Sequence, residues 1–133
     1  MKKVNCILLI DDNEADNYLH SKAILSTGVF NHLEVATGGE AALAYLQKAG
    51  DNAAPKPDLI FLDINMPGMD GFEFLEEYHK LDPALKSQMV VFMLTSSLMP
   101  EDNEKAMNSG EVSDFLNKPL TEETVQKIVE KCF

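Results

Sequence analysis

Residues 59–71 of the chain read LIFLDINMPGMDG, and this stretch decides the fold. Its first four residues are all apolar, and Asp63 follows them at once. A short, continuous apolar run is typical of a strand that is covered on both faces, as in a parallel sheet flanked by helices. The sequence therefore predicts a buried strand that ends in a carboxylate, with a helix beginning after Asp70-Gly71.

Four further apolar runs have the length of a strand. They are Cys6–Ile10, Leu33–Ala36, Met89–Leu94 and the weaker run Asp114–Asn117. Helix-like stretches of roughly ten to fifteen residues separate the strands, which is the pattern of repeated βαβ units. The sequence therefore predicts an α/β fold with a parallel sheet.

The expected helices follow from apolar spacing and from capping residues. We expect a first helix from about Glu14 to Ser26 and a second that begins near Gly39. A third begins after Gly71, a fourth begins near Pro100, and a fifth follows Thr121, which serves as its N-cap. Their apolar positions are Ala15, Leu19 and Ala23, then Ala42, Leu43, Leu46 and Ala49, then Phe72, Leu75 and Tyr78, and finally Val125, Ile128, Val129 and Cys132 facing inward. The turn-rich residues 50–57 predict a loose loop before the third strand.

Size and charge limit the classes of function. The 133 residues fit one domain, and strands and helices use the whole length, so we expect a single domain over residues 1–133 with no output domain. The net charge of -11 opposes binding to nucleic acid or to an anionic membrane. Cys6 and Cys132 are expected to be buried free thiols, and no segment resembles a signal peptide or a membrane span, which predicts a cytoplasmic location.

Polar side chains follow four of the five predicted strands, at the point where each strand ends. They are Asp11-Asp12, Asp63, Thr95-Ser96 and Asn117-Lys118. The carboxyl ends of parallel strands share one edge of a sheet, and ligands bind at that edge. We therefore expect three carboxylates, hydroxyl groups and one ammonium group to meet there.

This set of groups suits phosphoryl chemistry with a hard cation. Clustered carboxylates bind Mg²⁺, which prefers oxygen ligands and commonly works with phosphate oxygens, and no cluster of histidines or cysteines argues for zinc. The Lys118 ammonium can hold a phosphoryl oxygen, and the Thr95 hydroxyl can donate to another. A carboxylate that is left uncommitted is a competent nucleophile for an acyl phosphate.

The stretch of residues 59–71 resembles the phosphoacceptor region of response-regulator receiver domains. Asp11-Asp12, Leu94-Thr95-Ser96 and Lys118-Pro119 resemble the other motifs of that family, in the same order. The resemblance covers essentially all of the chain. It implies a flavodoxin-like, doubly wound sheet of five parallel strands, in the order 2-1-3-4-5, with helices on both faces.

The resemblance also implies a role for each site residue. Asp63 takes the phosphoryl group, Asp12 is a direct ligand of Mg²⁺, Asp11 assists through a coordinated water, and the backbone carbonyl of Asn65 is a further ligand. Thr95 reorients to bond the phosphoryl group, and Lys118 pairs with it. Phe115 matches an aromatic switch position whose burial follows that movement, and the bond before Pro119 is cis in the family.

The function that the resemblance implies is a phosphorylation-dependent signalling module with no turnover of a separate substrate. Its partners are a histidine kinase or phosphotransfer protein and a downstream protein target. An alternative is a Mg²⁺-dependent phosphohydrolase, although the common type carries a D-x-D motif after its first strand. A receiver-like domain that binds a partner without phosphorylation and a flavin-binding protein are two weaker alternatives.

The segment before Phe115 falls outside the common pattern of the family. The segment from Gly110 to Phe115 has one more residue than is usual in the family, which predicts a longer turn at residues 111–113. The methionines fill gaps by default, but Met66, Met69 and Met99 would form an adaptable partner surface if they were exposed. His20, His32 and His79 are scattered, and we assign them no part in the chemistry.

Overall fold

A computed structural model describes residues 4–86, 89–95, 104, 108 and 110–133 of the chain. The strands are β1 (Val4–Ile10), β2 (Phe30–Ala36), β3 (Leu59–Asp63), β4 (Val90–Thr95) and β5 (Val112–Asn117). The helices are α1 (Glu14–Thr27), α2 (Gly39–Gly50), α3 (Gly71–His79), the short α4 (Pro83–Lys86) and α6 (Glu122–Cys132). Pro100, where a helix was expected to begin, lies outside the described residues, as do Ser96 and Met99, whereas Glu104 and Asn108 are described and are helical.

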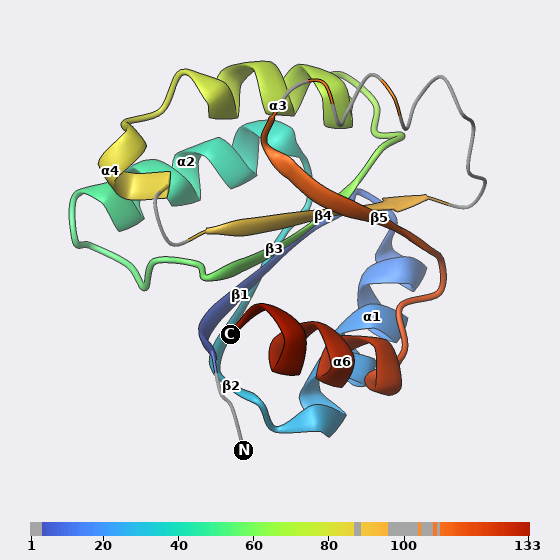
Figure 1. Cartoon of the computed structure of the whole chain (residues 1–133). Coiled ribbons are helices and arrows are strands. Elements are labelled where there is room, and N and C mark those ends of the chain that lie inside the picture. The colour runs from blue at the N-terminus through green and yellow to red at the C-terminus, as the bar shows by residue number, and fades with distance from the viewer. Residues whose placement is uncertain (1–3, 87–88, 96–103, 105–107, 109) are drawn as a thin grey trace.

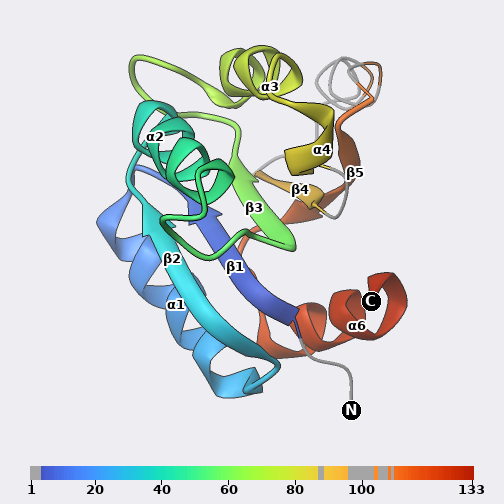
Figure 2. The same cartoon turned by 90° about the vertical axis from the view of Figure 1, so that its left-hand side faces the viewer.

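The five strands form one parallel sheet in the order β2-β1-β3-β4-β5. The helices α2 and α3 cover one face of this sheet, and α1 and α6 cover the other (Figures 1 and 2). This arrangement confirms the predicted doubly wound, flavodoxin-like fold. It also places the carboxyl ends of β1, β3, β4 and β5 along a common edge.

The central strands β1 and β3 are buried because their alternating side chains enter two different apolar clusters. The α2–α3 cluster contains Leu8, Ile10, Ile60 and Leu62 from these strands, with Ala42, Leu46, Phe74, Leu75 and Tyr78 from the helices. The α1–α6 cluster contains Ile7, Leu9, Leu59 and Phe61 from the same strands, with Ile24, Val125, Ile128 and Val129. Both faces of the strands are therefore apolar, which explains the continuous apolar runs in the sequence.

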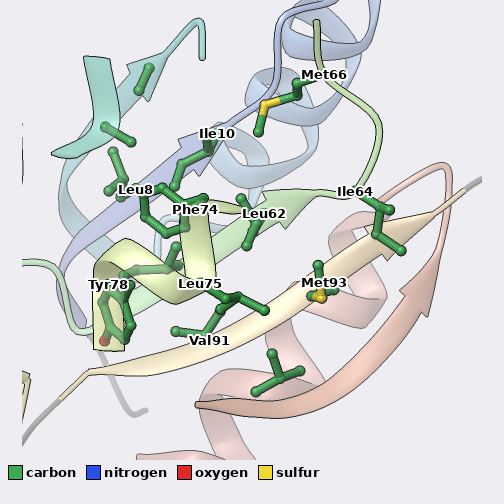
Figure 3. Packing of buried hydrophobic residues seen from close by; sticks show 14 of the residues in the cluster. Leu8, Ile10, Leu62, Ile64, Met66, Phe74, Leu75, Tyr78, Val91 and Met93 are labelled. Carbon is green, nitrogen blue, oxygen red and sulfur yellow. The ribbon is translucent and has the colours of Figure 1, made fainter. Parts of the chain in front are cut away.

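The α2–α3 cluster shows how α3 is fixed against the sheet. Phe74, Leu75 and Tyr78 point from α3 onto the strands that carry Leu8, Leu62 and Val91 (Figure 3). A capping box begins the helix, in which the Asp70 side chain accepts from the backbone of Glu73 and the Glu73 side chain accepts from the backbone of Asp70. The side chains at the predicted apolar positions of α2 and α3 are all buried or partly buried, which confirms this part of the prediction.

The buried face of α1 differs from the predicted one. The apolar spacing indicated Ala15, Leu19 and Ala23, but Ala15 and Leu19 are exposed. The buried residues of this helix are instead Asn17, His20, Ile24 and Thr27. Apolar spacing was misleading here because three of the four buried side chains are polar.

The last helix is close to the prediction. Thr121 is its N-cap, with the side chain accepting from the Thr124 backbone, and Val125, Ile128 and Val129 are buried. Cys132 was predicted to face inward, but it is exposed as the last residue of α6, whereas Cys6 is buried in β1. Both thiols are free, as expected, but burial is confirmed for Cys6 alone.

The extra residue before Phe115 is accommodated inside a strand. Val91 pairs with Val112, but the next residue Phe92 pairs with Asp114, so Ser113 is left over as a β-bulge. The predicted longer turn at residues 111–113 is therefore wrong, because β5 already begins at Val112. A bulge takes up one residue while both flanking parts of the strand keep their pairing.

Two further observations concern the surface. Met66 is buried in the α2–α3 cluster, so it does not contribute to an exposed methionine surface, while Met69 is only partly buried. Within the described parts of the chain, every helix falls short of the length and hydrophobicity needed to cross a bilayer.

Candidate functional site

The site is assembled at the carboxyl edge of the sheet from four neighbouring strands. Ile10 of β1 pairs with Leu62 of β3, so Asp11 and Asp63 follow their strands at the same level. In the next pairs, Asp63 is level with Leu94 of β4, and Thr95 is level with Asn117 of β5. The parallel register therefore brings together the four predicted polar strand ends.

Lys118 lies at the centre of this edge. Its Nζ atom is 3.0 Å from Asp11 Oδ2, 3.0 Å from Asp63 Oδ1 and 2.7 Å from Asp16 Oδ2. The backbone N–H of Lys118 donates to the carbonyl oxygen of Thr95 at 2.8 Å, which fixes the start of the loop after β5. The Lys118-Pro119 bond is cis, as the family resemblance implied.

Three carboxylates form the part of the site that could hold a cation. One oxygen each of Asp11, Asp12 and Asp63 lies within 4.8 Å of the others. Asp11 and Asp63 are buried and Asp12 is exposed, so the cluster opens to solvent on one side. This oxygen-only set with an open side fits a hard divalent cation that keeps some of its waters.

The loop after β3 holds Asp63 close to α3. The backbone N–H of Gly71 donates to the carbonyl oxygen of Ile64 at 2.8 Å. A Cβ atom at Gly71 would lie 2.7 Å from the Asp63 carbonyl oxygen, so only glycine allows this approach of helix to strand end. Asn65, predicted to offer its carbonyl to the cation, is exposed in the same loop.

Burial and neighbouring charges shift the pKa values of Asp63 and Lys118. Burial raises the pKa of Asp63, and the nearby Asp11 charge adds to this, although the hydrogen bond from Lys118 acts in the opposite direction. Burial alone would lower the pKa of Lys118, but hydrogen bonds to Asp16, Asp63 and Asp11 outweigh it and raise the pKa overall. Lys118 is therefore firmly charged, and it supports the ionised form of Asp63.

The two predicted switch residues lie on the α2–α3 side of the sheet. Phe115 is level with Met93, and both belong to the α2–α3 cluster. Thr95 comes two residues after Met93 in β4, so its side chain projects from the same face. Thr95 is buried at the end of its strand, and Phe115 is buried in this structure.

Helix α1 contributes residues that the sequence did not single out. The side chain of Asn13 caps the helix by accepting from the Asp16 backbone N–H, and the backbone N–H of Asn13 donates to Asp11 Oδ1 at 3.0 Å. The Asn17 amide donates to the Asp11 carbonyl oxygen at 2.8 Å. Asn13 as an N-cap directly after Asp11-Asp12 was a usable signal, whereas nothing in the spacing indicated that Asp16 would reach Lys118.

The histidines divide into two groups. His32 pairs with Glu34 and His79 pairs with Glu111, both at the surface and away from the acidic cluster. His20 is buried behind the site on α1, near enough for the charges of Asp16, Lys118 and Asp11 to act on its pKa. Burial is the largest effect, and the pKa of His20 is lowered.

Comparisons with known proteins agree with this geometry. The family model of the response regulator receiver domain matches residues 7–130. The chain is 35% identical over 125 residues to the response regulator Rcp1 of Synechocystis, covering 93% of this chain and 83% of Rcp1. It is 32% identical over 124 residues to the signal transduction histidine-protein kinase BarA of Escherichia coli, covering 92% of this chain but only 12% of that kinase.

Solved structures show the same architecture. A two-component response regulator from Cytophaga hutchinsonii superposes with a TM-score of 0.85 and 32% identity, over 98% of each chain. The Mn²⁺-bound form of Rcp1 superposes with a TM-score of 0.71 and 35% identity, covering 96% of this chain and 90% of Rcp1. A bound divalent metal in that relative and the acidic cluster here fit the same kind of site. The chain belongs to the response regulator receiver domain family and is a receiver domain of two-component signalling.

Proposed function

We propose that Asp63 is the phosphoacceptor of this receiver domain and that the reaction requires Mg²⁺. The observation that carries the proposal is the position of the Asp63 carboxylate, which lies 3.0 Å from the Lys118 ammonium and beside Asp11 and Asp12. A carboxylate held between a cation site and a fixed ammonium can meet an anionic phosphoryl group without net repulsion.

The metal ligands in this proposal are Asp11, Asp12, Asp63 and the backbone carbonyl of Asn65. Mg²⁺ bound there supplies positive charge that offsets carboxylate repulsion and neutralises phosphoryl oxygens. The spacing of the three carboxylate oxygens within 4.8 Å supports this assignment. The exposed side of the cluster, at Asp12, leaves room for the phosphoryl donor to approach.

The residues of the chain then have defined roles in the transfer. A carboxylate oxygen of Asp63 forms a bond to phosphorus while the bond from phosphorus to the donor histidine nitrogen breaks, and the imidazole leaves with that electron pair. Lys118 holds one phosphoryl oxygen as a point charge. The Thr95 hydroxyl donates to another, and its movement is coupled to Phe115 through their shared face of the sheet.

The partners in this proposal are proteins. A histidine kinase or phosphotransfer protein supplies the phosphoryl group, which the similarity to a segment of the BarA kinase supports. A downstream protein target reads the phosphorylated surface around Phe115. The net charge of -11 supports protein partners over nucleic acid or an anionic membrane.

The direct test is phosphorylation by acetyl phosphate, with and without Mg²⁺. The wild-type chain should gain one hydroxylamine-labile phosphoryl group only when the cation is present. Asp63→Asn should gain none, while the exposed loop variant Asp51→Asn should behave as wild type. An equal adduct in Asp63→Asn would contradict the assignment of Asp63, and sustained release of phosphate from small esters would favour a phosphohydrolase instead.

A further inference from the structure

Asp16 has a contact with Lys118 that the proposed function does not use. Asp16 lies in the first turn of α1, and its Oδ2 atom is 2.7 Å from Lys118 Nζ, the shortest of the three carboxylate contacts at that atom. The Asn13 cap fixes the turn by accepting from the Asp16 backbone N–H at 2.9 Å. The contact therefore joins α1 to the loop after β5 across 102 residues of sequence.

The hydrogen-bonding capacity of Lys118 limits what it can bind at one time. An ammonium group has three N–H donors. Among the residues that the structure describes, Asp11, Asp16 and Asp63 take up three contacts with the Lys118 Nζ atom. A phosphoryl oxygen that arrives at Lys118 must therefore displace one of these carboxylates.

Burial decides which carboxylate gives way. The side chains of Asp11 and Asp63 are 1% and 7% exposed, whereas that of Asp16 is 31% exposed. Asp11 and Asp63 are proposed ligands of the cation and are poorly hydrated where they lie, whereas the partly exposed Asp16 can be hydrated by water when it moves away. Asp16 is therefore the partner whose release costs least.

We propose that Asp16 is a positioning residue that holds Lys118 in the unphosphorylated state and is displaced when a phosphoryl group binds. This inference rests on the proposed function of Asp63 and Lys118. Asp16 acts through Lys118 and does not touch the phosphoryl group. Its carboxylate competes with the phosphoryl oxygens for the ammonium, so it weakens the binding of any phosphoryl group or mimic.

The first test measures the affinity of the full chain for beryllofluoride in the presence of Mg²⁺, observed by fluorine NMR. Asp16→Asn keeps the size of the side chain and removes the competing charge. We expect it to bind the mimic about two- to fivefold more tightly, the range that a partly exposed ion pair contributes. Asp16→Glu should bind the mimic with an affinity close to that of the wild-type chain, because it keeps the negative charge.

The matched control is Glu14→Gln. Glu14 is exposed in the same first turn of α1, and its substitution changes the net charge by the same amount. An equal gain in Glu14→Gln would show a general charge effect and would overturn the inference, as would unchanged or weaker binding by Asp16→Asn. Failure of the wild-type chain to bind the mimic would overturn the proposed function as well, so the two failures are distinguishable.

The second test observes Lys118 itself without any phosphoryl mimic. An ammonium held by three carboxylates exchanges its protons slowly, so its Nζ–H signal should be visible by nitrogen-detected NMR in the wild-type chain and in Glu14→Gln. Asp16→Asn should lose this protection. A Lys118 signal equally protected in Asp16→Asn, or absent from the wild-type chain, would contradict a holding role for Asp16.

Discussion

Helices α2 and α3 on one face of the sheet and helix α1 on the other face bury different kinds of side chain. Buried positions of α2 and α3 are mainly apolar or aromatic, as at Leu46 and Phe74. Three of the four buried residues of α1 are polar, and Asn17 binds the backbone of Asp11 directly. We infer that α2 and α3 mainly stabilise the fold, whereas the polar contacts of α1 position the acidic cluster and Lys118.

The largest effect on stability is expected in the α2–α3 cluster. Leu46→Ala removes a fully buried side chain of the α2–α3 cluster and should lower the free energy of unfolding by about 2–5 kcal/mol. The folded fraction should still be phosphorylated by acetyl phosphate at close to the wild-type rate. Urea denaturation and the phosphorylation assay check the two parts, and a lost phosphorylation rate with full stability would reverse the proposed division of roles.

A smaller loss of stability with a larger effect on the site is expected in α1. Asn17→Ala removes the buried donor to the Asp11 carbonyl and should destabilise the chain by about 1–3 kcal/mol. It should also slow phosphorylation of the folded protein, because Asp11 loses a contact that fixes it.

The control for Asn17 is Asn31→Ala, which alters an exposed asparagine of β2; among the described residues its side chain makes one long contact, to Asn5 Oδ1 at 3.4 Å. It should change neither stability nor rate appreciably. Equal phosphorylation rates in Asn17→Ala and the wild-type chain would show that α1 does not position Asp11.

His20 makes the α1 layer sensitive to pH. Burial lowers the pKa of His20 from its ordinary value of 6.5, so the folded state favours the neutral ring and the unfolded state binds more protons below that pH. Its contribution to stability is therefore present above the ordinary pKa and is lost as the pH falls. Between about pH 7.5 and about pH 5.5 the wild-type chain should lose more stability than His20→Leu. Denaturant titrations at several pH values measure the free energy of unfolding of both proteins. An equal loss in the wild-type chain and in His20→Leu would contradict this prediction.

The smallest effect is expected on the outer side of α1. Leu19 is 54% exposed, so Leu19→Ala should change the free energy of unfolding by no more than about 0.5 kcal/mol. It is the exposed counterpart of Leu46→Ala, with the same chemical change. A loss comparable to that of Leu46→Ala would mean that the apolar spacing had indicated the buried face of α1 correctly.

Most of the fold could be predicted from the sequence because its signals are local. Continuous apolar runs marked β1, β3 and β4, and Thr121 marked the start of α6. The meeting of Asp11, Asp63 and Lys118 followed from topology, since parallel strands end at one edge. These inferences needed only the order of elements and the residues at their ends.

The remaining features depend on contacts between distant segments. The contact of Asp16 with Lys118 depends on how α1 is rotated against the sheet. The spacing of apolar residues could not predict that rotation, because the buried face of α1 is mainly polar. The position of Ser113 depends on which pairing β4 prefers, since a longer turn and a bulge both absorb one residue. Cys132 fits the apolar spacing of α6, but the helix ends there and leaves it exposed.

The most direct test of the central claim is to locate the phosphoryl group on the chain. After reaction with acetyl phosphate and Mg²⁺, borohydride reduction converts an aspartyl phosphate into homoserine, which mass spectrometry of the peptides can assign to one residue. We predict homoserine at position 63 alone, with Asp11, Asp12 and Asp16 unchanged. Reduction at any of these three carboxylates in place of Asp63, or at no carboxylate, would contradict the account.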